Sequence, residues 1–224
     1  MFYRIEDIPT PECMQRCVEQ LAMLVPVRRR EQAFCYKHLH GQYCCLRTWQ
    51  MLHELLIEHA FLPASFPLSD LTFTVDDYGK PSLSFEQRGP QRACSHGVPC
   101  SGLCPLSAAV CFSISHTKNA LAVAVSEHEV GIDIEMLVSP QRLCDKAFLD
   151  YTLSPQEQAQ LRAADTIEAQ RIFTRLWTRK EALFKALGTG INVRELPFVL
   201  EKPHPYTIRS YDGDAYVCSL AYCD

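Results

Sequence analysis

Residues 173–191 read FTRLWTRKEALFKALGTGI, and this stretch predicts the helix around which the fold is built. Apolar side chains recur at helical spacing along it, at Ile172, Leu176, Leu183 and Leu187. Gly188 and Gly190 follow directly, and glycine at this place favours the end of a helix. Lys185 in the last turn favours the same end, because a positive charge stabilises a helix C-terminus.

The predicted helix also has a polar face. Trp177, Glu181 and Lys185 stand four residues apart and therefore form one stripe along the helix, with Lys180 on its flank. This stripe has two interpretations from spacing alone. It can be a solvated face with an ordinary Glu-to-Lys pair, or it can present a carboxylate and an ammonium for chemistry.

A second stretch, AVAVSEHEVGIDIEML at residues 122–137, favours the chemical interpretation. Apolar residues alternate there with Gly131, Asp133 and Glu135, which is typical of a half-buried strand, so both carboxylates point to one side. Adjacent carboxylates repel unless a cation lies between them, and oxygen ligands favour magnesium or calcium. With Glu181 as a third ligand, the pattern predicts a site for magnesium or calcium, and Lys185 would add charge for phosphate oxygens.

These motifs bring a resemblance to a known family. GIDIE followed by WxxKEAxxK is similar to the signature pair of the 4'-phosphopantetheinyl transferases, in the long, surfactin-synthetase-activating form. SISHT at residues 113–117 and DYGKPSL at residues 77–83 resemble the upstream motifs of that family, in the expected order. The resemblance implies an α+β fold of two pseudo-symmetric halves, residues 1–126 and 127–224, each a long helix packed on a small antiparallel sheet.

The resemblance also implies a reaction and its site. The reaction is the Mg²⁺-dependent transfer of 4'-phosphopantetheine from coenzyme A to a serine of an apo acyl or peptidyl carrier protein, with release of adenosine 3',5'-bisphosphate. The metal ligands implied are Asp133, Glu135 and Glu181. The catalytic side chains implied are Glu181, Lys185, Asp133 and His116. The residues implied to contact coenzyme A are Arg28, Lys80, Ser115, His116 and Lys185.

The basic residues outside this helix, taken without the resemblance, can also be explained as ordinary structural or solvent-exposed side chains. Arg28, Arg29 and Arg30 oppose the dipole at an expected helix start, so they form either a solvated turn or an anion site. The resemblance favours contact with the 3'-phosphate of coenzyme A and aligns Arg28 best. Lys80 alone is typical of an exposed turn, whereas the resemblance implies a contact with the adenine end. His116 alone fits a structural histidine at a strand end.

Further helices and strands are expected along the whole chain. Helices are expected to begin at Pro11, after Pro26, after Pro140 and at Ser154. The segment after Pro26 is expected to be interrupted near Gly41 and to end before Pro63. Strands are expected at residues 2–6, 71–75, 81–85, 110–115, 120–125, 206–211 and 215–222, and near Phe198.

Residues 86–110 form an insertion relative to compact members of the family. Cys94, His96, Cys100 and Cys104 within it could bind zinc, but they lack a CxxC pair. Glycine, proline and serine are abundant there, which favours a surface loop.

Bulk properties limit the function classes. The net charge of −4 and pI near 6.1 give no general basic field, so no nucleic-acid partner is expected. The charged N-terminus and the lack of a long apolar segment predict neither a signal peptide nor a membrane span. We therefore expect a cytoplasmic monomer whose 12 cysteines are reduced. Two alternatives stay open: a non-catalytic module that binds coenzyme A or a carrier, and a metal-dependent nuclease.

Overall fold

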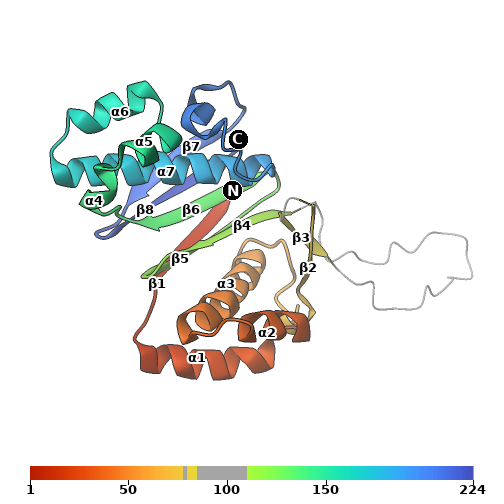
Figure 1. Ribbon diagram of the computed structural model, residues 1–224. Helices are drawn as coiled ribbons and strands as arrows, with labels where there is room; N and C mark the ends of the chain where they lie inside the picture. Colours follow the sequence, from red (N-terminus) through yellow and green to blue (C-terminus); the bar gives the residue numbers. More distant parts are fainter. Residues whose placement is uncertain (78–79, 85–109, 224) are drawn as a thin grey trace, which may run out of the picture.

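Two three-stranded antiparallel sheets lie at the centre of the fold, between two groups of helices (Figure 1). The computed structural model describes residues 1–77, 80–84 and 110–223. The first sheet has the strand order β1-β5-β4, and the second has the order β6-β8-β7. The predicted mixture of helices and small antiparallel sheets, the α+β class, is confirmed.

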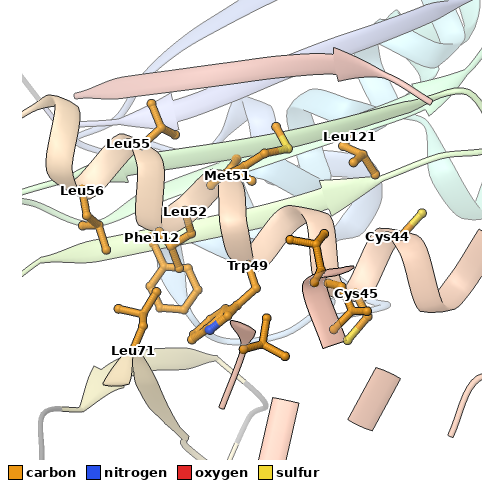
Figure 2. Close-up of a cluster of buried hydrophobic side chains, with 14 of the residues drawn as sticks. Cys44, Cys45, Trp49, Met51, Leu52, Leu55, Leu56, Leu71, Phe112 and Leu121 are labelled. Carbon is orange, nitrogen blue, oxygen red and sulfur yellow. The ribbon is translucent and has the colours of Figure 1, made fainter. Parts of the chain in front are cut away.

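The first half packs three helices and a hairpin around one sheet. Its elements are β1 (Phe2–Asp7), α1 (Pro11–Leu24), α2 (Val27–Phe34), α3 (Leu39–Glu58), the 3-10 helix η1 (Leu68–Asp70), β2 (Thr72–Val75), β3 (Pro81–Ser84), β4 (Cys111–His116) and β5 (Ala120–Ser126). Buried apolar side chains of α3 meet Phe112 and Leu121 of the sheet (Figure 2). Trp49 lies within this core, 1% exposed, with its ring 6.1 Å from that of Phe112.

The second half packs one long helix across a sheet. Its elements are β6 (Val130–Met136), α4 (Pro140–Leu143), α5 (Lys146–Thr152), α6 (Pro155–Arg162), α7 (Thr166–Leu187), the 3-10 helix η2 (Leu196–Glu201), β7 (Thr207–Asp212) and β8 (Tyr216–Tyr222). Helix α7 begins earlier than its apolar repeat suggested, because Asp165 caps it by accepting from the Glu168 amide. It ends as predicted at Gly188, which has a φ of 70°.

Small side chains allow the two sheets to pack face to face. Ala120, Ala122 and Ala124 lie on one face of β5 and are fully buried in the same core as Ile132 and Ile134 of β6. The alternate residues of β5 face the first core, against α3. Strand β5 therefore joins the two halves, since each of its faces belongs to a different core.

Strand β6 is more buried than the alternating pattern predicted. The residues Val130 to Ile134 are all buried, because α7 covers one face of the strand and the first sheet covers the other. Gly131 makes the approach of α7 possible. A Cβ atom at this position would lie 1.9 Å from the carbonyl oxygen of Ala182, so no side chain fits.

Two details of the predicted element pattern are corrected by the structure. The strand expected near Phe198 is wrong: η2 occupies this place, and Pro197 there lacks the amide that a central strand needs. The interruption expected near Gly41 lies instead at residues 35–38, and Gly41 is inside the first turn of α3. A Cβ at Gly41 would meet the Tyr36 ring at 2.8 Å, so the glycine lets this corner close.

Some expectations lie outside what the structure describes or tests. The candidate zinc ligands Cys94, His96, Cys100 and Cys104 are outside the described residues. None of the helices in the described ranges is both long enough and apolar enough to cross a bilayer. The pseudo-symmetric relation of the two halves and their boundary at residue 126 stay predictions.

Candidate active site

Asp133 is the centre of the candidate site. Its carboxylate lies on β6 and is 4% exposed. The Oδ1 atom accepts hydrogen bonds from Ser115 Oγ at 2.8 Å and from Lys185 Nζ at 2.7 Å. The Oδ2 atom is buried and has no hydrogen-bond partner within the part of the chain that the structure describes. One buried carboxylate thus joins β4, β6 and α7 and keeps one oxygen unsatisfied.

Backbone contacts hold these three elements in register. Lys185 Nζ also donates to the carbonyl oxygen of Ile132 at 3.0 Å. On the other side of β6, the Ile132 amide donates to Ser113 Oγ at 3.0 Å. The sequence predicted Ser115, Asp133 and Lys185 as site residues, and the structure brings them together. Their separation of 70 residues along the chain is bridged by the packing of the sheets and of α7.

The two other predicted ligands share the electrostatic environment of Asp133. Burial, together with the charges of Asp133 and Glu181, raises the pKa of Glu135 to about 7. Burial and the charge of Asp133 likewise raise the pKa of Glu181 to about 7. Lys185 opposes both shifts only in part. A cation bound between these carboxylates would stabilise their charged forms.

His116 lies at the end of β4, next to Ser115. Burial of its imidazole lowers the pKa, and the positive fields of His40 and Lys185 lower it further. The His40 ring meets the His116 ring edge to face, with 6.4 Å between centroids. His40 is itself held by a contact of its Nε2 with the Lys118 carbonyl oxygen at 3.1 Å. A neutral imidazole surrounded by positive charge favours an anionic ligand.

Lys80 lies in the wall of a cavity of about 290 Å³ that extends along α7 from the carboxylate cluster. The cavity is lined by Lys80, Pro81, Phe112, Ser113, Ile114, Glu181, Phe184, Lys185, Gly188, Gly190 and Ile191. The predicted contacts Lys80 and Lys185 therefore border one space, together with the carboxylate-bearing Glu181. Most of the lining is apolar.

The three consecutive arginines have different environments. Arg29 donates to the carbonyl oxygen of Cys45 at 2.7 and 3.1 Å and lies over the Trp49 ring, 4.9 Å from its centre. Burial lowers the pKa of Arg29. Arg28 is exposed and lies 5.6 Å from the Phe73 ring centre. Arg29 thus packs against the first core, whereas the side chain of Arg28 is exposed.

Comparison with known proteins finds similarity of the motif-bearing half to one family. Residues 129–222 match the family profile described as the 4'-phosphopantetheinyl transferase superfamily. The 4'-phosphopantetheinyl transferase gsp of Aneurinibacillus migulanus is 26% identical over 183 residues, 81% of this chain and 64% of its own length. A 4'-phosphopantetheinyl transferase of Bacillus subtilis is 26% identical over 92% of this chain and 85% of its own length. The HetI transferase of Nostoc is 32% identical over 52% of this chain and 49% of its own length.

The chain is a relative of the 4'-phosphopantetheinyl transferases. The match to the superfamily contains β6 and α7, which carry Asp133, Glu135, Glu181 and Lys185. The similarity continues into the first half, since the Bacillus subtilis protein aligns with 92% of the chain. The alignments with the gsp and HetI transferases span 64% and 49% of those two proteins.

The donor set of this phosphopantetheinyl transferase relative fits a hard divalent cation. The unsatisfied, buried Oδ2 of Asp133 and the raised pKa values of Glu135 and Glu181 are the observations that support the fit. Within residues 1–77, 80–84 and 110–223, no three His, Cys, Asp or Glu side chains already have the geometry of a metal cluster. The carboxylates are therefore neighbours that must converge to ligate one ion.

Sequence reasoning missed the role of Lys180. This side chain is fully buried, and its ammonium donates to Glu157 Oε2 at 2.6 Å, to the Thr152 carbonyl oxygen at 2.8 Å and to the Pro197 carbonyl oxygen at 2.9 Å. Glu157 forms a capping box with Ser154, which confirms the helix start expected at Ser154. The sequence showed only that Glu157 lies in the first turn of one predicted helix and that Lys180 lies on a later one. The pair fixes α6 and η2 against α7, the helix that carries the site.

Proposed function

We propose that this chain is an enzyme that transfers the 4'-phosphopantetheine moiety of coenzyme A to a serine of an apo acyl or peptidyl carrier protein. The reaction requires Mg²⁺ and releases adenosine 3',5'-bisphosphate. The observation that carries this proposal is the contact of Asp133 with both Ser115 and Lys185, beside two carboxylates whose pKa values are raised. The similar proteins named 4'-phosphopantetheinyl transferases support the reaction class.

The cavity along α7 suits the nucleotide end of coenzyme A. Its apolar lining next to Lys80 can cover the adenine ring, while Lys185 lies at the end nearest Asp133. We assign the pyrophosphate to the space between Lys185, Ser115 and His116, because Lys185 is a cation and the His116 imidazole can donate a hydrogen bond. Arg28, exposed at the start of α2, is the proposed contact for the 3'-phosphate.

Asp133, Glu135 and Glu181 are the residues that would hold Mg²⁺. When bound, the ion supplies positive charge that stabilises the pyrophosphate oxygens as negative charge builds up on the leaving group. Lys185, held at Asp133 by a contact of 2.7 Å, adds a second positive charge to the site. Ser115 keeps the Asp133 carboxylate oriented through its hydrogen bond to Oδ1.

The transfer itself needs a base and a route for the leaving group. The carrier serine oxygen attacks the phosphorus that stays attached to pantetheine. The bond from that phosphorus to the bridging oxygen breaks, and adenosine 3',5'-bisphosphate leaves with the electron pair. Glu181 is the proposed acceptor of the serine proton, since its carboxylate borders the cavity beside Lys185. Lys185 neutralises charge on the departing phosphate, and the neutral His116 imidazole can donate a hydrogen bond to it.

Mass spectrometry of the carrier tests the proposal directly. Apo carrier domains are incubated with coenzyme A, Mg²⁺ and the protein, and each is weighed. We expect a mass gain equal to one phosphopantetheine on the serine-bearing peptide, and none when Mg²⁺ is replaced by a chelator. No gain on any of several acyl and peptidyl carriers would contradict the proposal. Binding of coenzyme A without transfer would favour a non-catalytic module instead.

We further propose that the enzyme acts as a cytoplasmic monomer built from pseudo-symmetric halves, residues 1–126 and 127–224. The similar construction of the two three-stranded sheets, each covered by a long helix, supports this division. The carrier is proposed to dock on the second half along residues 141–166. Tyr151 is 48% exposed within this segment, and Leu143, Phe148 and Leu149 are partly buried around it.

A further inference from the structure

The ammonium of Lys80 connects the two halves at the far end of the cavity. Lys80 precedes β3 of the first half, and its Nζ pairs with the carboxylate of Glu129, which precedes β6 of the second half. The same Nζ donates to the carbonyl oxygen of Ala186 at 3.0 Å, in the last turn of α7. The Lys80 side chain is 19% exposed and that of Glu129 is 50% exposed. The amine therefore has a carboxylate and a helix-end carbonyl as partners before any ligand binds.

Neighbouring groups restrict where the Lys80 chain can lie. A Cβ atom at Gly188 would stand 2.9 Å from Lys80 Cδ, so the lysine stem passes directly over this glycine. Tyr206 also donates to the Ala186 carbonyl oxygen, at 3.4 Å. The thiol of Cys111 lies beside Glu129, whose charge adds to burial in raising the pKa of Cys111. Glu129 thus lies beside the Lys80 amine and the Cys111 thiol, both of the first half.

This arrangement decides what the end of the cavity offers a ligand. Glu129 balances the charge of Lys80, and the neighbouring wall consists of the lysine stem, Pro81, Phe184 and Ile191. A phosphate gains little there, because the nearest cation is already paired. A flat, uncharged ring gains apolar contact and can still form a hydrogen bond at the rim. The paired cation favours a base over an anion at this end.

We propose that Glu129 is a positioning residue for recognition of the base of coenzyme A. It holds Lys80 across the C-terminal end of α7 and so shapes the neutral end of the cavity. This inference rests on the proposed function for the identity of the ligand. It assigns Glu129 no contact with the reacting atoms, so its removal should change ligand affinity and base preference while leaving the chemical step in place.

Glu129→Gln tests the inference, because it keeps the shape of the side chain and removes its charge. We expect the KM for coenzyme A to rise about three- to fivefold, the range of an ion pair that is partly exposed, with kcat within about twofold. Preference for coenzyme A over an analogue carrying guanine in place of adenine should narrow by a similar factor. Glu129→Asp keeps the charge but has a shorter side chain, so its KM and base preference should lie between those of the wild-type protein and Glu129→Gln.

Glu127→Gln is the matched control, since it removes the same charge from an exposed side chain two residues away. Equal KM values and equal base preference in the Glu127 and Glu129 variants would overturn the inference. Calorimetry with adenosine 3',5'-bisphosphate separates it from the proposed function. If the wild-type protein transfers nothing, weaker binding of this nucleotide by Glu129→Gln than by Glu127→Gln still supports the role of Glu129, and equal binding refutes it.

Discussion

The Asp133 carboxylate is the residue on which catalysis should depend most. Asp133→Ala removes the carboxylate that accepts from both Ser115 and Lys185. It also removes a proposed ligand of Mg²⁺, the ion that would neutralise the pyrophosphate charge. We expect the transfer rate to fall by about 10²- to 10³-fold, as for loss of a central electrostatic contact. Initial rates at limiting Mg²⁺ measure this, with Glu12→Gln, which removes an exposed carboxylate on α1, as control. Near-normal turnover of the Asp133 variant would disprove the assignment.

Glu181 gives the metal-free protein a pH-dependent stability. Its pKa is raised from 4.5 to about 7 in the folded chain, so between these values the folded state binds more protons than the unfolded state. The free energy of unfolding should therefore decrease as the pH rises from about 4.5 through 7. Glu181→Gln should flatten this slope. Thermal unfolding in a chelator between these pH values measures the difference, and a steeper slope in the variant would contradict it.

Adding Mg²⁺ should act in the opposite direction on the wild-type protein. A bound cation favours the charged form of Glu181, so the gain in melting temperature on adding Mg²⁺ should increase with pH across the same interval. Glu181→Gln should show a smaller gain that depends less on pH. An equal gain in both proteins would mean that Glu181 is not close to the ion.

Individual site residues were predictable where one sequence motif gave both the residue type and the side of the helix or strand that it faces. Asp133 and Lys185 lie as expected, because the alternation of a strand and the repeat of a helix fix which side each faces. Glu129 and Lys180 were not predictable as partners of Lys80 and Glu157. Their pairings join residues 49 and 23 positions apart, and no local periodicity encodes such a distance.

At the level of the elements, the buried pair of Lys180 and Glu157 should control how α7 is held. Lys180→Met leaves Glu157 buried at 6% exposure without its cation. We expect a loss of about 3 to 5 kcal/mol in the free energy of unfolding, as for breaking a buried pair. Chemical denaturation measures it. The double variant Lys180→Met with Glu157→Gln should recover part of the loss, and additive losses would contradict the pairing.

The contact of β6 with α7 depends on a position without a side chain. Gly131→Ala places a methyl group 1.9 Å from the Ala182 carbonyl oxygen and 2.7 Å from the Ala186 amide, both backbone atoms. Helix α7 must move away, which should cost about 1 to 3 kcal/mol and separate Lys185 from Asp133. Transfer should then fall in a variant that remains folded, as checked by circular dichroism. Unchanged activity would show that α7 tolerates the shift.

Elements with strong local signals were predicted well, and those set by packing were not. Helix α1 spans Pro11–Leu24 as expected from its proline start and apolar repeat. The segment near Phe198 contains the apolar run LPFVL, which favours a strand by composition. The structure makes it the 3-10 helix η2 because Leu196 and Val199 pack against α7 and the Pro197 carbonyl accepts from Lys180. Tertiary contacts override propensity at this place.

For the molecule as a whole, the shared core between the sheets predicts that the two halves unfold together. Ala120, Ala122 and Ala124 of β5 pack in one cluster with apolar side chains of β6 and β8, so neither sheet keeps its buried face when the other unfolds. The family resemblance predicted two halves but not this coupling. The alternation of alanines on one strand was visible in the sequence, whereas its facing partner strand was not.

The two tryptophans of the chain provide the measurement, since Trp49 lies in the first half and Trp177 in the second. Trp177→Phe leaves a fluorescence reporter in the core of α3, and Trp49→Phe leaves one on α7. In each variant, we expect the denaturation midpoint from fluorescence to coincide with that from far-UV circular dichroism, as for one cooperative unit. Comparing two probes within the same variant removes any difference in stability between the variants. Fluorescence and dichroism midpoints that separate in either variant would show that the halves unfold independently and that the alanine face of β5 does not couple them.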